Sequence, residues 1–285
     1  MRIAALLLRR GLTFALVVVA SSLVFGALLW FAPGSKLGSA EGASFVGWFG
    51  DFWVGVFTGD LGRSYRGYPV SQMVWRGAGT SMPLIGAGLL LSLASGLGLA
   101  LAAGPRMRGL SRVLRGAVHA LSLCPVFLLG YLALVIFAVP PEGAGQALAA
   151  VAILAIGDGM LSDVVLGIDA ELAALRKRDF VQSARLRGTP LWRHYVPHLA
   201  LPLAQIAASR MAWLIGGVLV LEMVLGIQGI GLIGYKAADS ADFALLVAIT
   251  VFVTAVVAGS SLLVDVLRVL VDPRVRKDRR AAGRP

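Results

Sequence analysis

The chain has 285 residues, of which 58% are hydrophobic and only 14% are charged, and its formal net charge at pH 7 is +11. Its mean hydropathy is +0.83. Such a composition cannot supply the polar surface of an ordinary soluble domain of this size, so it excludes that class and predicts an all-α integral membrane protein.

Windows of about 20 apolar residues, the length that crosses a bilayer, predict six transmembrane helices. The windows cover residues 11–32, 80–103, 116–139, 147–168, 203–225 and 243–267. An even number of crossings places both termini on one side. That side receives 20 of the 26 Lys and Arg residues and the other side receives five, so both termini are predicted to be cytoplasmic. The same distribution explains the positive charge and predicts no nucleic-acid partner.

The whole chain, residues 1–285, is predicted to form one transmembrane domain. Residues 33–79 are the expected outer segment, 170–198 a cytoplasmic loop and 269–285 a basic cytoplasmic tail. Within the outer segment, apolar residues spaced by three and four predict one helical face: Phe45, Trp48, Phe49, Phe52, Trp53, Val56 and Phe57. This helix either lies on the outer membrane interface or docks on the flank of the bundle.

The fourth predicted span contains two acidic residues, Asp158 and Asp163. On an insertion scale two central aspartates cost about 5–7 kcal/mol, so this helix is expected to be buried against protein with its carboxylates facing neighbouring helices or water. Two interpretations remain open. The carboxylates line a substrate path, or they form hydrogen bonds between helices near the ends of the span.

Several short motifs do not indicate catalysis or metal binding. The run "GIGLIG", Gly229 to Gly234, fits a dinucleotide pattern but follows a membrane helix on the outer side, so a re-entrant or turn-forming segment is expected. His194 and His198 lack a third ligand and Pro197 is expected to interrupt their helical turn. The sequence contains no phosphate-binding loop and no nucleophile elbow. Any ATP must therefore be bound by another chain.

The cytoplasmic segment "DFVQSARLRG" indicates a helix, a glycine break and a second helix. Asp179 is a candidate N-cap. Ala184 and Gly188 are small residues four apart, which would leave one face open to close approach by another chain, while Arg185 and Arg187 would be available to acidic groups. On these residues alone, a docking element and a solvated connecting loop are equally good interpretations.

The segment "QSARLRG" resembles the Glu-Ala-Ala…Gly loop of binding-protein-dependent ABC importer permeases, with Gln182, Ser183, Ala184 and Gly188 at the matching positions and glutamine where that family has glutamate. Nearly the whole chain resembles the dipeptide/oligopeptide/nickel permease family. The matching segments are "LRRGLTFALVVVASSLVFGALLWFAPG", "GDLGRSYRGYPV", "LSLCPVFLLG", "RDFVQSARLRG", "LEMVLGIQGIGLI" and "LLVDVLRVLVDPRVR".

This resemblance implies a type I ABC importer permease fold in the bacterial cytoplasmic (inner) membrane. It implies that Asp179, Gln182, Ser183, Ala184, Arg185, Arg187 and Gly188 couple the chain to cytoplasmic ATPase subunits. The implied partners are a second homologous permease, two ATPase subunits that bind ATP and Mg²⁺, an extracytoplasmic substrate-binding protein and the lipid bilayer. The chain itself would be no enzyme and would bind no cofactor.

The cargo implied by the resemblance is a peptide or a similar small solute, and a metal chelate is the alternative within the family. A self-contained secondary transporter or channel is the alternative from another class. That alternative requires an internal inverted repeat and charge partners within the membrane, and the sequence indicates neither.

Overall fold

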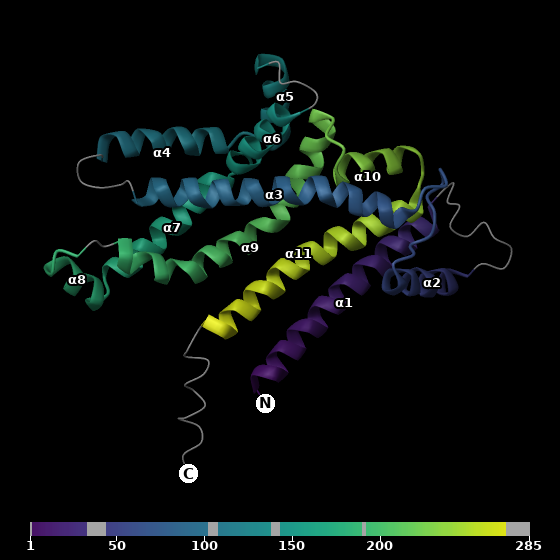
Figure 1. Ribbon diagram of the computed structural model, residues 1–285, viewed down its shortest axis with the longest axis horizontal. Coiled ribbons are helices and arrows are strands. Elements are labelled where there is room, and N and C mark those ends of the chain that lie inside the picture. The colour runs from purple at the N-terminus through teal and green to yellow at the C-terminus, as the bar shows by residue number, and fades with distance from the viewer. Residues whose placement is uncertain (1, 33–43, 102–107, 138–142, 190–191, 272–285) are drawn as a thin grey trace, which may run out of the picture.

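The computed structural model describes residues 2–32, 44–101, 108–137, 143–189 and 192–271, and this part of the chain is helical, with one isolated β-bridge between Arg63 and Pro69. The helices are α1 (Arg2–Trp30), α2 (Phe45–Thr58), α3 (Val70–Leu101), α4 (Arg108–Ser122), α5 (Val126–Phe137), α6 (Ala144–Ile156), α7 (Met160–Arg176), α8 (Asp179–Leu186), α9 (Trp192–Leu225), α10 (Ile230–Asp239) and α11 (Phe243–Val271). Figure 1 shows their arrangement. The predicted basic tail lies almost wholly outside the described residues.

Four helices among the described residues, α1, α3, α9 and α11, are long and apolar enough to cross a membrane. Two further pairs pass the same criterion but are bent, by 99° between α4 and α5 and by 48° between α6 and α7. The chain therefore has four candidate spans, or six if each bent pair is one span. The prediction of one continuous helix in the third window and one in the fourth was wrong, because each of these windows contains a break.

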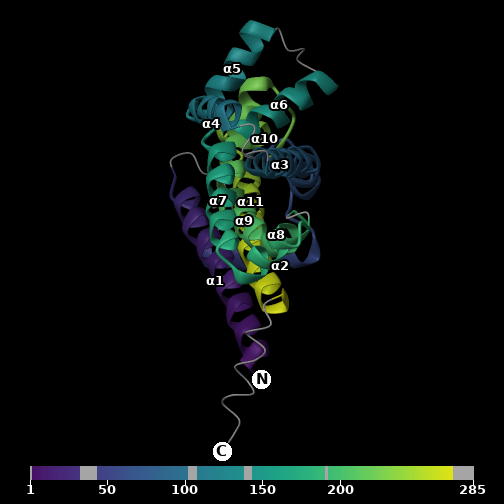
Figure 2. The ribbon, with the colours of Figure 1, turned by 90° about the vertical axis from the view of Figure 1, so that its left-hand side faces the viewer.

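The centre of the molecule is formed by α3 and α9, which pack on each other and on α7 (Figures 1 and 2). The largest buried side chains in this region include Leu154, Ile168 and Leu221. Glycine allows the helices to cross closely: a Cβ on Gly96 of α3 would lie 2.5 Å from Cγ1 of Val164 on α7. Small residues at such crossings are typical of helices packed within a membrane.

The helices α1 and α11 pack side by side along most of their length, with the start of α1 beside the end of α11 (Figure 1). At that end Arg10 and Asp265 form an ion pair of 3.1 Å. At the other end α2 turns back on α1, where Trp48 packs against Trp30 with 5.8 Å between ring centroids. Trp48, Phe52 and Trp53 also pack on the cluster formed by α1 and α11. Of the two predicted settings for this helix, docking on the bundle is therefore the one observed.

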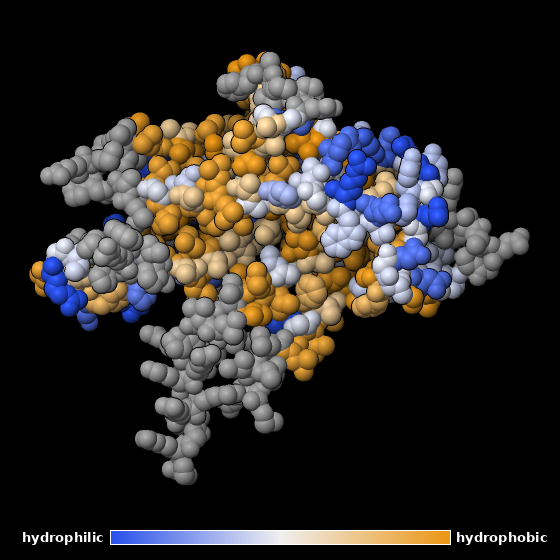
Figure 3. All heavy atoms as spheres, viewed as in Figure 1, coloured by the Kyte–Doolittle hydropathy of each residue, from blue (hydrophilic) through white to orange (hydrophobic). Residues whose placement is uncertain are grey.

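The surface carries apolar side chains over most of the face in Figure 3, whereas hydrophilic side chains gather near α8 and, at the opposite end, around α2 and α10. Exposed leucines and valines on α1, such as Leu16 and Val24, belong to the apolar part. An apolar belt between two polar ends is the distribution that a bilayer requires.

Candidate functional site

The two bent helix pairs meet at their breaks. The amide of Gly159 donates to the carbonyl of Ser122 at 2.6 Å, and the amide of Asp158 donates to the carbonyl of Cys124 at 3.3 Å. The break between α4 and α5 therefore pairs with the break between α6 and α7, and each satisfies backbone groups that the bends expose. Non-helical backbone at membrane depth is tolerated where protein buries it or where it lines a cavity.

Asp158 is held in an unusual backbone conformation at this junction. Its φ is 50° and that of Gly159 is 76°, the left-handed region that Asp and Gly adopt most readily. Its Oδ1 accepts a hydrogen bond of 3.1 Å from the amide of Val126, the first residue of α5. Asp158 thus caps α5, and the residue as a whole remains exposed despite this bond.

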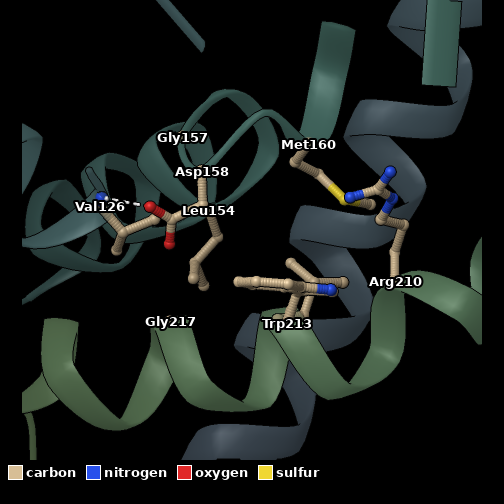
Figure 4. A pocket seen from close by; sticks show the side chains of 9 residues that line it. Val126, Leu154, Gly157, Asp158, Met160, Arg210, Trp213 and Gly217 are labelled. Atoms are coloured by element: carbon tan, nitrogen blue, oxygen red, sulfur yellow. Dashed lines mark hydrogen bonds between the residues drawn. The ribbon is translucent and has the colours of Figure 1, made fainter. Parts of the chain in front are cut away.

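A recess and an adjoining groove lie beside Asp158. Val126, Leu154, Gly157, Asp158, Met160, Arg210, Trp213, Leu214 and Gly217 line the recess (Figure 4). The groove holds about 410 Å³ and is lined by Val126, Phe127, Asp158, Ala212, Trp213, Gly216, Gly217 and Val220. Figure 4 shows Asp158 and Arg210 at opposite ends of the recess, with the ring of Trp213 between them. The site therefore combines a carboxylate, an aromatic ring and apolar walls.

Asp163, the second predicted path residue, lies in the first turn of α7 and forms an ion pair with Arg210 of α9. Both side chains are partly exposed, at 38% for Asp163 and 24% for Arg210. The inference that the spans contain no charge partners was therefore wrong. Arg210 lies within the fifth predicted span, and no local spacing in the sequence indicates a pair between residues 47 positions apart.

The predicted coupling segment forms α8, an eight-residue helix between α7 and α9. Asp179 is its first helical residue rather than its N-cap, and its negative charge still suits the first turn of the helix. Gly188 follows the helix with φ of 66°, which glycine adopts without strain. The expected order of helix, glycine break and helix is thus present, and α9 continues unbroken past Pro197.

The two faces of α8 differ from the prediction. Ala184 is fully buried and Val181 is 3% exposed, with Val181 packed in the same cluster as Tyr195 and Leu199 of α9. Ala184 therefore seats α8 on its own chain and is not available as a contact face, which corrects the sequence analysis. The exposed residues of α8 and its end include Ser183, Leu186, Arg187 and Gly188. Gln182 and Arg185 belong to α8, but their side chains lie outside the described part of the structure.

Glu222 on α9 is a polar residue that the sequence analysis did not single out. It is fully buried, and the amide of Gly231 donates to its Oε2 at 2.7 Å. The "GIGLIG" run begins α10, and Gly231 packs directly on the backbone of Leu219. The expected close approach of glycine backbone is present, and the acceptor that holds it is Glu222.

No group of three or more His, Cys, Asp or Glu residues that could hold a metal ion occurs within the described residues. His198 lies beside Phe180 of α8, with 4.9 Å between ring centroids, so it belongs to the contact between α8 and α9. The side chain of His194 lies outside the described part.

Residues 80–277 match the family described as the inner membrane component of binding-protein-dependent transport systems. The chain belongs to this family. The match runs from α3 through α11 and so includes the paired breaks, α8 and the groove.

Similar proteins extend the comparison over more of the chain. A probable peptide ABC transporter permease of Sinorhizobium fredii is 25% identical over 252 residues, 81% of this chain and 79% of that protein. The nickel import system permease NikB of Staphylococcus aureus is 25% identical, and the match covers 76% of this chain and 69% of NikB. The oligopeptide permease OppB of Salmonella typhimurium is 24% identical, with 76% of each chain covered.

These findings identify the chain as an ABC importer permease of the peptide and nickel type and as a multi-pass membrane protein. The family transports solutes and is not a family of enzymes.

Proposed function

We propose that the chain is one of two permease subunits of an ATP-driven importer in the bacterial cytoplasmic membrane. In this proposal it forms half of the path for peptides or similar small solutes, and α8 couples it to a cytoplasmic ATPase. ATP and Mg²⁺ are bound by the ATPase subunits. An extracytoplasmic binding protein delivers the solute.

The proposed topology has six crossings with both termini in the cytoplasm. The side-by-side packing of α1 and α11 supports it, because the first residues of α1 and the last of α11 lie at the same end of the molecule. The positive-inside rule assigns that end to the cytoplasm. The same assignment places α8 in the cytoplasm and α2 and α10 outside.

A second permease subunit is proposed to cover α5 and one face of α9. Phe127, Tyr131 and Val135 of α5 are 53%, 61% and 63% exposed. Trp213 and Val220 expose the side of α9 that lines the groove. A groove open along one side becomes an enclosed path when a similar surface faces it, and Asp158 then lines that path.

The observation that carries the coupling role is the two-sided structure of α8. Ala184 is buried and Val181 packs in one cluster with residues of α7 and α9, while Leu186, at 89% exposure, and Arg187 point away from the chain. Arginine is enriched in protein interfaces, and burial of an exposed leucine by a partner would add favourable apolar contact. Force applied to α8 would reach α9 directly, and α9 lines the groove.

The test is co-purification of the complete importer through a tag on this chain. We expect Leu186→Asp or Arg187→Glu to lower the amount of bound ATPase subunit by about tenfold, which corresponds to about 1.4 kcal/mol. Arg66→Glu is the matched control, because Arg66 is exposed at the opposite end of the molecule. Unchanged ATPase retention by both α8 variants would contradict coupling through this helix.

The cargo is proposed to be a peptide, because two of the relatives described above are named for peptides. NikB is named for nickel, so a metal chelate is the second candidate. Membership of the family favours either over a self-contained transporter. Mass spectrometry and metal analysis of solute bound to the purified complex distinguish the two.

A further inference from the structure

The groove contains one carboxylate whose charge no described side chain balances. Asp163 and Arg210 are paired with each other, whereas Asp158 accepts only the amide of Val126. An amide donor stabilises a carboxylate but leaves its charge in place. Near a protein surface the effective dielectric constant is lower than in bulk water, so such a charge attracts a cation more strongly there.

The position of this carboxylate is fixed by the backbone. The amide of Asp158 donates to the carbonyl of Cys124 at 3.3 Å, and its Oδ1 is tied to α5. Two anchors on opposite sides of the bend leave the side chain little freedom, so the charge is oriented before any solute arrives. Preorganised groups of this kind bind without the cost of ordering.

Trp213 supplies the second recognition element. It lines both the recess and the groove, and 64% of its surface is exposed. The face of an indole ring attracts an organic cation, by about 0.5–2 kcal/mol depending on hydration. A carboxylate and an exposed indole beside one apolar groove are the combination that binds a protonated amine.

We propose that Asp158 and Trp213 form a transient binding site for the protonated amino group of the cargo, such as the N-terminal ammonium of a peptide. This inference rests on the proposed function, because it requires that the groove belong to the translocation path. The groove volume of about 410 Å³ suits a small solute. A site with one carboxylate and one aromatic ring selects for positive charge, and its few contacts allow the solute to be released.

The variant that tests the charge is Asp158→Asn. The amide oxygen of asparagine still accepts the Val126 hydrogen bond and asparagine tolerates positive φ, so the cap and the bend are retained while the charge is lost. A residue that acts only as a helix cap would tolerate this change. A residue that binds ammonium would not.

The first measurement uses the complete importer with Cys124→Ser and a single new cysteine, Ala212→Cys, in the groove. Its modification rates by an aminoethyl and by a sulfonatoethyl methanethiosulfonate are compared. We expect Asp158→Asn to lower the ratio of ammonium to sulfonate reactivity about tenfold, or about 1.4 kcal/mol. The ratio at Tyr235→Cys on α10, which lines neither the recess nor the groove, should not change.

The second measurement is ATP-driven uptake of a tripeptide with a free or an acetylated N-terminus into proteoliposomes, in the presence of the substrate-binding protein. All variants are measured with the same binding protein, so its own selectivity does not affect the comparison between them. We expect Asp158→Asn and Trp213→Leu to reduce the preference for the free amine, whereas Trp75→Leu, an exposed tryptophan outside the groove, should not.

The outcomes separate the two proposals. An Ala212→Cys that no reagent modifies would contradict the placement of the groove in a water-filled path, and with it the proposed function. Modification with an unchanged charge ratio in Asp158→Asn would overturn the ammonium site alone. The same conclusion would follow if the preference for the free amine survived the substitution.

Discussion

Ser81 on α3 donates a hydrogen bond of 2.5 Å to Glu222 on α9, and its hydroxyl accepts one of 2.8 Å from the amide of Ile230. Together with the bond from Gly231 to Glu222, these contacts hold the first turn of α10 against two spans. Helix N-termini expose unpaired amides, and burial makes each of them costly unless an acceptor is present.

We expect Glu222→Ala to loosen α10, because it leaves the Gly231 amide and the Ser81 hydroxyl without their acceptor, at about 1–3 kcal/mol for each group. Hydrogen exchange at the amides of Ile230 and Gly231 should rise. Glu222→Gln retains an acceptor oxygen and should show a smaller rise, and the exposed neighbour Gln228→Ala should show none. Equal exchange rates in Glu222→Ala and Gln228→Ala would show that Glu222 does not hold the first turn of α10.

The ion pair between Asp163 and Arg210 gives a second prediction. Arg210→Met leaves Asp163 without its partner beside the groove, and the loss of this partly exposed ion pair is expected to lower the free energy of unfolding by about 0.2–1 kcal/mol. The double variant Arg210→Met/Asp163→Leu should recover part of that loss, because no unpaired charge remains.

Thermal unfolding of the purified complex in detergent measures this effect, with Arg210→Lys as a control that keeps the charge. A double variant that is less stable than Arg210→Met would show that the two residues act independently.

Hydropathy predicted the membrane class and the position of most spans, because apolar length is a local property of the chain. It did not predict the bends. Averaging over a window hides a break as short as Leu123 to Pro125, although Pro125 and the Gly157 to Gly159 run were visible signals. The window predicted for the second span also began too late, because α3 starts at Val70. The first turns of α3 contain the polar residues Gln72 and Arg76.

The candidate site was predicted only in part. Asp158 and Asp163 were singled out because an acidic residue in a span needs an explanation. Their different surroundings, a helix cap for one and an arginine for the other, depend on residues 32 and 47 positions away. The open face proposed for Ala184 failed for the same reason: small size predicts close packing, but not whether the neighbour is the same chain.

Gly188 provides a test of coupling that spares the membrane domain. Apart from its chain neighbours, no atom of the described residues lies within 4 Å of where its Cβ would be, so Gly188→Trp should place the ring outward, at a backbone cost of about 1–2 kcal/mol for the left-handed conformation. We expect intact assembly of the membrane domain but ATP hydrolysis that no longer drives uptake. Measuring both rates in proteoliposomes checks this.

Gly188→Asn is the matched control, because asparagine adopts positive φ readily and is small. It should retain coupled transport. Normal uptake together with normal ATPase stimulation by Gly188→Trp would count against contact between this turn and a partner.

The crossing of α3 and α7 gives a prediction with an internal control on one helix. A Cβ on Gly96 would overlap Val164, with 3.3 Å to its Cβ and 3.6 Å to its backbone carbon, so Gly96→Ala must push the helices apart. Overpacking of this kind costs about 1–3 kcal/mol, which exceeds the gain of about 0.5–1 kcal/mol in helix propensity.

Gly98→Ala, two residues further on, meets no described atom beyond its own helix within 4 Å and gains the propensity alone. We therefore expect opposite signs: a lower unfolding temperature for Gly96→Ala and an unchanged or higher one for Gly98→Ala, measured on the purified complex in the same detergent. Because α7 also carries Asp163 and follows directly from Asp158, separation of α3 from α7 should reduce solute uptake as well. If Gly96→Ala unfolded at the temperature of Gly98→Ala, close contact between α3 and α7 would not be what holds the paired breaks in position.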